Sequence, residues 1–223
     1  AGSFVSLVGE SGCGKSTIAG ILAAKNRGYS GEITIGGVPL NAVNEENLMQ
    51  KVVLVRHNSY LFKGTVEENL KMAKPDATKE EMEAVLQKVN LLGFLQTQDG
   101  LQTQLLEKAS NLSGGQCQRL VIARALLRTD SAVYIFDEAA SNIDVESEEL
   151  IMNVIHELAK TKTVLLISHR LANVVKSDKI YFLKDGEIKE SGKHDELMSQ
   201  NGAYRHLYES QMALENYGKG GVA

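Results

Sequence analysis

The sequence predicts an α/β fold, in which short buried strands alternate with amphipathic helices. Four runs are short, continuously apolar and rich in β-branched residues, which is typical of strands covered on both faces of a mainly parallel sheet. They are SFVSLV (3–8), KVVLV (51–55), AVYIF (132–136) and TVLLIS (163–168). A second observation is an apolar stripe at helical spacing between residues 147 and 160, made by Leu150, Ile151, Val154, Ile155 and Leu158.

Length and composition indicate an ordinary folded chain. Its 223 residues suggest one large domain or a domain with a sizeable subdomain. They are 43% hydrophobic and 23% charged, which is close to the averages of globular proteins. The net charge of −4, without a run of lysines and arginines, gives no support for a nucleic-acid partner or an anionic membrane surface. The two cysteines, Cys13 and Cys117, favour a reducing compartment over a disulfide framework. No apolar run is long enough to cross a bilayer, so we expect a soluble chain whose membrane link comes through a partner.

The middle of the chain follows a different pattern, because strand-like runs disappear between Phe62 and Arg128. A hydroxyl three residues before Glu or Gln is the capping-box signal for the start of a helix, and it recurs at Thr65, Thr78 and Ser113. We therefore expect a helical insert. EITIGGVPL (32–40) and IYFLKDGEIKESG (180–192) predict hairpins with Gly-Gly and Asp-Gly turns, which add a small antiparallel β part.

The stretch GESGCGKS at residues 9–16 matches the phosphate-binding pattern G-x-x-x-x-G-K-[ST] between a strand and a helix. Its glycines let peptide N–H groups converge on an anion that also faces the N-terminus of the helix. Lys15 would reach the β- and γ-phosphates, and the Ser16 hydroxyl would ligate Mg²⁺. The alternative, a glycine turn with a solvated lysine, would match by chance in about one chain in a hundred of this length. Cys13 fills a wildcard position as a small loop residue.

Asp137 and Glu138 end the apolar run VYIF, at the carboxyl edge where open α/β sheets bind their ligands. Two adjacent carboxylates there suggest two separate roles, one as a metal ligand and one in catalysis. Asp137 would hold the Mg²⁺ shell and Glu138 would polarise an attacking water. A strand that ends in solvated acids is the alternative, and the phosphate loop favours the catalytic interpretation.

Ser113, Gly114 and Gly115 begin an amphipathic helix in the run NLSGGQCQRLVIARALL. An ordinary helix cap closed by Gln116 is one interpretation. However, two consecutive glycines lower helix stability by about 1 kcal/mol each, and they leave bare backbone that an anion can approach. The stretch therefore suggests a second phosphate contact. It lies far in sequence from Lys15, so one chain need not close both contacts on one nucleotide.

GESGCGKST, LSGGQ, VYIFDEA, SNID and LLISH stand in the order and approximate spacing of ABC transporter nucleotide-binding domains, which the chain resembles from residue 3 to about residue 210. The resemblance implies a P-loop NTPase with a mainly parallel core sheet, a small antiparallel β part and an inserted α-helical subdomain. Residues 1–62 and 126–223 would form the RecA-like ATP-binding core, with a partial antiparallel β subdomain. Residues 63–125 would form the helical signature subdomain.

The resemblance also implies roles for single residues. The ATP phosphates would be bound by Gly9, Glu10, Ser11, Gly12, Cys13, Gly14, Lys15, Ser16 and Thr17. Ser16 and Asp137 would hold magnesium, and the catalytic residues would be Lys15, the carboxylate Glu138 and the switch histidine His169. The loop residue Asp144 would cross to the opposite subunit in a head-to-tail dimer with two ATP molecules. The residues that would cap ATP held by the partner domain are Ser113, Gly114, Gly115 and Gln116.

Two further segments, 60–70 and 194–211, look like those of exporter-type domains, which normally follow a transmembrane domain in the same polypeptide. On this resemblance the chain is a C-terminal fragment lacking about two earlier strands, one of which bears the aromatic residue that stacks on adenine. We therefore expect weak ATP affinity. The implied function is ATP binding and hydrolysis that powers export, at the cytoplasmic face of the inner membrane, with a second nucleotide-binding domain and a transmembrane domain as partners.

The chain departs from the family at His57, where a glutamine is usual. We expect His57 to contact the nucleotide and magnesium in its place, with altered magnesium affinity because histidine titrates near neutral pH. The stretch LLEKAS (105–110), shortly before LSGGQ, keeps Glu107 but lacks the glycines that exporters usually have there.

Two alternative functions stay open: a degenerate, regulatory half of a heterodimeric transporter, and a soluble ABC ATPase acting on nucleic acid or in translation. The transported substrate cannot be read from this sequence.

Overall fold

The computed structural model describes residues 2–26, 28–141 and 143–220, with the backbone alone for 215–220. Its main sheet has six strands in the order β10-β9-β1-β8-β7-β4. From one edge to the other these are Glu187–Gly192, Lys179–Lys184, Ser3–Gly9, Thr163–Ile167, Val133–Asp137 and Val52–Arg56. All neighbours pair in parallel except β10, which runs antiparallel to β9. The mixed α/β architecture with a mainly parallel sheet is confirmed.

The register of the parallel strands aligns their carboxyl ends. Asp137 at the end of β7 pairs with Arg56 of β4 on one side and with Ile167 of β8 on the other. Gly9 at the end of β1 pairs with Leu183 of β9. Because these ends meet at one edge of the sheet, the loops that follow β1, β4, β7 and β8 share a single surface.

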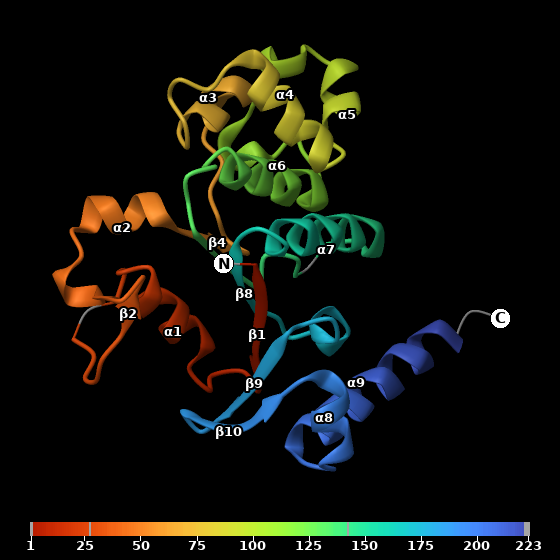
Figure 1. The fold of residues 1–223 in the computed structure, drawn as a ribbon. Coiled ribbons are helices and arrows are strands. Elements are labelled where there is room, and N and C mark those ends of the chain that lie inside the picture. Colours follow the sequence, from red (N-terminus) through yellow and green to blue (C-terminus); the bar gives the residue numbers. More distant parts are fainter. Residues whose placement is uncertain (1, 27, 142, 221–223) are drawn as a thin grey trace.

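Helices cover both faces of the sheet (Figure 1). On one face α7 (Val145–Ala159) buries Ile151, Met152 and Ile155 against the main core, as the apolar stripe predicted for the two isoleucines. On the other face α1 (Lys15–Leu22) and α2 (Glu45–Lys51) enclose a smaller core. That core consists of Leu7, Ala19, Leu40, Leu48, Val52, Ile135, Ile167 and Leu183.

The predicted helical insert is present as a group of four helices at the top of Figure 1. They are α3 (Val66–Lys71), α4 (Lys79–Lys88), α5 (Leu92–Gln96) and α6 (Gly114–Leu126). The predicted capping boxes at Thr65, Thr78 and Ser113 all form. Short turns and strands connect the helices: β5 (Gly64–Thr65), η2 (Gly100–Gln102), β6 (Gln104–Leu105) and η3 (Glu107–Ala109). The helices share one continuous core with the sheet, and the division into 63–125 and the remainder stays a prediction.

Both predicted hairpins form. The first joins β2 (Thr34–Ile35) to β3 (Val38–Pro39) and is followed by the short turn η1 (Leu40–Ala42). The second joins β9 to β10 through Asp185 and Gly186, whose φ angles of 52° and 78° match the turn that Asp-Gly favours. The structure adds what the hairpin pattern did not predict, namely that β9 also pairs in parallel with β1.

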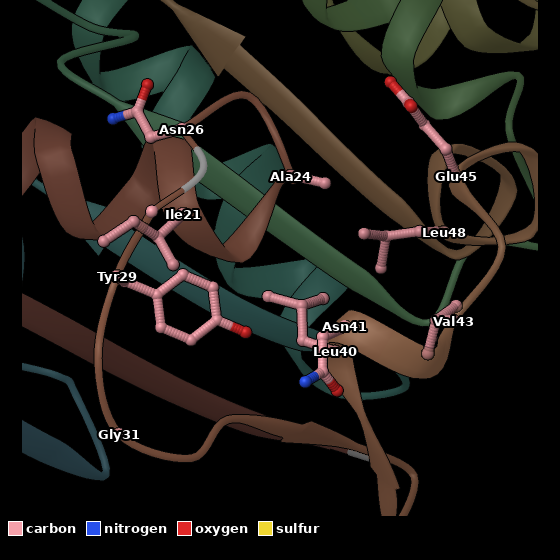
Figure 2. A pocket seen from close by; sticks show the side chains of 11 residues that line it. Ile21, Ala24, Asn26, Tyr29, Gly31, Leu40, Asn41, Val43, Glu45 and Leu48 are labelled. Carbon is pink, nitrogen blue, oxygen red and sulfur yellow. The ribbon is translucent and has the colours of Figure 1, made fainter.

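A cavity of about 440 Å³ lies between the C-terminal end of α1, η1 and α2. Figure 2 shows Ile21, Tyr29, Leu40 and Leu48 among the side chains that line it. It lies at the opposite end of α1 from Lys15, so it is separate from the loops at the carboxyl edge of the sheet.

The chain ends in η4 (Leu171–Val174), α8 (His194–Ser199) and α9 (Ala203–Gly220). The far end of α9 extends away from the body of the molecule, as Figure 1 shows in blue. Among the described residues, every helix is too short or too polar to serve as a membrane span.

Candidate active site

The loop between β1 and α1 has a backbone that requires glycine. Gly9 has a φ of 146°, and a Cβ atom there would lie 2.1 Å from the carbonyl oxygen of Leu183 on the neighbouring strand. Gly14, which precedes α1, has a φ of 108°. These two positions bend the chain sharply from strand to helix, and the loop residues between them are partly or fully exposed. The local structure matches a phosphate-binding loop.

Lys15 is 5% exposed although it stands at the positive end of the α1 dipole. Its Nζ donates to the carbonyl oxygens of Gly9 (2.9 Å) and Glu10 (2.8 Å). The Cys13 sulfur lies 3.6 Å from the same nitrogen, so this wildcard residue borders the ammonium group. The loop therefore folds around a buried cation, which is poised to meet an anion held by the loop.

Ser16 and Asp137 meet although they lie far apart in sequence. The Ser16 hydroxyl donates to Oδ1 of Asp137 at 3.0 Å, and Asp137 is 4% exposed. The other carboxylate oxygen, Oδ2, lies 3.7 Å from Nε of Arg56. Sequence reasoning missed Arg56, whose position became informative only once the register placed it beside Asp137.

The donor set fits magnesium. A hydroxyl and a carboxylate are hard oxygen ligands, and Mg²⁺ sites that also bind a nucleotide use one or two protein ligands plus phosphate oxygens and waters. Among the described residues, there is no group of three or more His, Cys, Asp and Glu side chains that could hold a metal ion alone. His57 donates its backbone N–H to the Asp137 carbonyl oxygen at 3.1 Å and has an exposed side chain. Its role as a metal or nucleotide ligand stays a prediction.

Glu138, directly after β7, adopts a left-handed conformation with a φ of 55°. Its backbone N–H donates to the carbonyl oxygen of Ile167 at 2.9 Å, which ties it to the end of β8. Its Oε1 lies 2.6 Å from Nε2 of His169, and the two side chains are 24% and 43% exposed. A left-handed glutamate is strained, and such strain is commonly found at functional sites. Glu138 and His169 also line a cavity of about 480 Å³.

The loop that carries His169 is held by contacts that sequence reasoning did not find. Arg170 forms an ion pair with the buried Glu148 of α7, and the Asn173 amide donates to the same carboxylate at 2.8 Å. From α9, the side chain of Gln211 bonds to the backbone of His169 and Leu171. No local motif could have indicated these contacts, because the partners lie 22 to 42 residues away.

The predicted signature residues gather where α6 and α7 begin. In the Ser113 capping box, Ser113 N–H donates to Gln116 Oε1 at 2.8 Å and Gln116 N–H donates to Ser113 Oγ at 3.2 Å. A Cβ atom at Gly115 would lie 2.3 Å from the Ser147 hydroxyl and 2.9 Å from Asp144 Oδ2, so glycine allows the two helix starts to touch. Asp144 caps α7 by accepting from Ser147 N–H at 2.8 Å. That bond and the Ser147 hydroxyl lower the pKa of Asp144.

The predicted residues thus fall into two groups. We call the first the phosphate-loop edge; it comprises the exposed loop residues and the convergent side chains, namely 9–17, Asp137, Glu138 and His169. The second, the signature site, comprises 113–116, Asp144 and Ser147. In Figure 1, α6 lies among the upper helices while α1 begins beside the lower end of β1, so the chain does not bring its own residues 113–116 to its own phosphate loop. Asp144, in contrast, lines the same cavity as Glu138 and His169.

Comparisons with known proteins agree with this geometry. Residues 1–141 match the protein family described as ABC transporter. A protein of Haemophilus influenzae named uncharacterized ABC transporter ATP-binding protein is 50% identical over 208 residues, which cover 93% of this chain and 37% of that protein. The ATP-dependent lipid A-core flippase of Vibrio vulnificus is 42% identical over 212 residues, which cover 94% of this chain and 36% of the flippase. The chain therefore spans little more than a third of the length of these curated relatives.

A solved structure shares the fold. It is described as a bacterial Atm1-family ABC exporter with ATP bound, and it superposes with a TM-score of 0.89 at 32% sequence identity. The superposition covers 95% of this chain and 37% of the exporter chain.

Proposed function

The chain belongs to the ABC transporter family, and from this premise we propose that it binds and hydrolyses ATP with Mg²⁺ to power export across a membrane. One observation supports the proposal most strongly. Lys15, the Ser16–Asp137 contact and the Glu138–His169 pair all lie at the phosphate-loop edge. A phosphate site, two oxygen ligands and a carboxylate beside a histidine are the groups that phosphoryl transfer to water needs.

Residues 9–17 would bind the β- and γ-phosphates. Peptide N–H groups of the loop and the first turn of α1 would donate to the phosphate oxygens. Lys15 would exchange the carbonyl oxygens of Gly9 and Glu10 for phosphate oxygens, which are stronger acceptors because the phosphate group is negatively charged.

Ser16 and Asp137 would hold Mg²⁺ through the two oxygens that already lie 3.0 Å apart. When bound, the ion neutralises charge on the phosphates and helps orient them. Arg56 lies on the other side of the Asp137 carboxylate and offsets part of its negative charge.

Glu138 would orient and polarise the attacking water. Its left-handed backbone sets the direction of the side chain, and His169 Nε2 holds the carboxylate at 2.6 Å. The same histidine would contact the γ-phosphate and so link the carboxylate to the phosphate.

A head-to-tail dimer would supply the signature site of a second copy or a related domain. The Ser113 capping box already pairs the side chains of Ser113 and Gln116, so what the start of α6 offers is peptide N–H groups, the helix dipole and the bare backbone of Gly114. Asp144, beside Gly115, would reach the opposite subunit.

A transmembrane domain is the second proposed partner, and with it the chain would lie at the cytoplasmic face of the inner membrane. Tyr60 and Phe62 are exposed and pack edge to face, with ring centroids 4.8 Å apart. With the exposed Met72, Phe62 borders a cavity of about 290 Å³ between β4 and α6. Exposed apolar side chains around a hollow favour contact with another protein segment.

The alternative of a degenerate, regulatory nucleotide-binding domain is less well supported, because the Glu138–His169 pair provides the groups that hydrolysis needs.

The test is Glu138→Gln in the intact protein. Because the amide cannot accept a proton but keeps the size of the side chain, we expect ATP hydrolysis to fall at least about 100-fold. Binding of Mg·ATP, measured by calorimetry, should stay within twofold. A variant that hydrolyses ATP at the unmodified rate would contradict the assignment of Glu138.

A further inference from the structure

We propose that Gln211 of α9 is a positioning residue that holds the His169 loop in its reactive geometry. The inference rests on the function proposed above, in which His169 contacts both Glu138 and the γ-phosphate. It assigns α9, an element at the far end of the chain from the phosphate loop, an influence on the hydrolysis step that acts through His169.

The Gln211 side chain bonds to two peptide groups of the loop at once. Its Nε2 donates to the carbonyl oxygen of His169 at 2.7 Å, and its Oε1 accepts from the N–H of Leu171 at 2.9 Å. Both distances are those of good hydrogen bonds. One planar amide therefore fixes the backbone on both sides of Arg170.

Other contacts hold the neighbours of His169 instead. Ser168 Oγ donates to the Arg170 carbonyl oxygen and accepts from the Arg170 N–H, at 3.1 and 3.0 Å. The Arg170 side chain pairs with Glu148 on α7. Gln211 differs from these because it acts on the carbonyl group of His169 itself.

The position of His169 depends on its backbone because its side chain is only partly enclosed. The side chain is 43% exposed and its contact with Glu138 is a single one at 2.6 Å. Displacing a catalytic group by about 1 Å can lower a rate about 100-fold. Loss of the two bonds to Gln211 would allow a smaller displacement of the same kind, with a smaller loss of rate.

The first turns of α9, which precede Gln211, are anchored to β10 and α8. Glu190 of β10 accepts from the N–H groups of Ala203 and Tyr204, at 2.6 and 3.1 Å, where α9 begins. The Tyr204 side chain is fully buried, and its hydroxyl lies 2.8 Å from Nδ1 of His194 on α8. A side chain on such an anchored helix is better placed to fix a loop than one on another loop.

The experiment compares Gln211→Ala and Gln211→Glu with Ser210→Ala in the intact protein. Glutamate keeps the size of the side chain and its acceptor but loses the donor to His169. We expect both Gln211 variants to lower kcat about tenfold, with KM for ATP and Mg·ATP binding within twofold. Ser210→Ala is the matched control, because this exposed hydroxyl lies on the same helix and donates within α9, to the His206 carbonyl oxygen.

A double-variant comparison separates positioning from a general loss of structure. If Gln211 acts through His169, Gln211→Ala should lower kcat in the normal background and have no further effect in His169→Ala. Equal effects in both backgrounds, or none in either, would overturn the inference. If His169→Ala itself hydrolyses ATP normally, the proposed function of His169 fails instead, so the two failures can be told apart.

Hydrogen exchange without nucleotide provides a readout independent of activity. The amide of Leu171 donates to Gln211, so its exchange should be at least about tenfold faster in Gln211→Ala. Amides of β8 should be unchanged. Unchanged exchange at Leu171 would also overturn the inference.

Discussion

The phosphate-loop edge and the signature site differ in where their polar groups find partners. At the phosphate-loop edge, groups from separate elements meet. Ser16 of α1 contacts Asp137 of β7, and Glu138, directly after β7, contacts His169 in the loop that follows β8. At the signature site, Ser113 and Gln116 pair within one helix turn, and Asp144 caps its own helix. The first region brings convergent side chains to a ligand, whereas the second offers backbone. A single chain should therefore bind nucleotide through the first region alone.

The largest effect that tests this comparison is expected from alanine at Gly115. Because the new Cβ atom would collide with Ser147 and Asp144, Gly115→Ala should lower the free energy of unfolding by about 1–3 kcal/mol. Mg·ATP binding by the single chain should nevertheless stay within twofold. Denaturant unfolding and calorimetry provide the two measurements.

Gly114→Ala is the matched control for Gly115→Ala. A Cβ atom at Gly114 would meet nothing within 4 Å, so this variant should stabilise α6 by about 1 kcal/mol. If either variant weakened Mg·ATP binding by the single chain tenfold, the separation of the two regions would be wrong.

The next effect concerns the strained backbone at the phosphate-loop edge. At the left-handed position of Glu138, glycine should be more stable than alanine by about 1 kcal/mol, the reverse of their order in a helix. Glu138→Gly and Glu138→Ala both lose the carboxylate, so the contact with His169 cancels in their difference. Equal thermal stability of the two variants would show that the backbone relaxes without cost.

The smallest effect is expected at Arg56. Because its guanidinium lies beside Asp137, Arg56→Gln should raise the Mg²⁺ affinity of the nucleotide complex about two- to fivefold, a modest change for a partly exposed pair. The Mg²⁺ concentration that gives half-maximal nucleotide binding measures it. Lys63→Gln, at an exposed position after the same strand, provides the control. A lower Mg²⁺ affinity in Arg56→Gln would mean that Arg56 supports the metal site.

Local signals in the sequence predicted much of the fold. The four apolar runs predicted β1, β4, β7 and β8 to within one residue at each end, because continuous burial leaves a clear pattern. The capping boxes were predictable because their partners lie three residues apart. Contacts set by tertiary packing were not predictable, as Arg56 beside Asp137 and Gln211 beside His169 show.

The candidate site residues were predicted from motifs and a family resemblance. The structure adds backbone conformations that these motifs do not indicate. The left-handed φ of 56° at Lys108 and of 52° at Ala109 is one example. In this stretch the sequence lacks the family's usual glycines, yet the backbone adopts the conformation that glycine favours. Composition does not reveal such strain.

The most direct test is calorimetry of Mg·ATP binding to the unmodified chain and to Lys15→Ala. Because the ammonium group would make charge-assisted bonds to the phosphates, the variant should bind at least about tenfold more weakly. The unmodified chain should bind saturably, and both proteins should unfold cooperatively. Equal affinity of the two proteins, or no binding by the unmodified chain, would contradict the proposal that the loop around Lys15 holds the nucleotide.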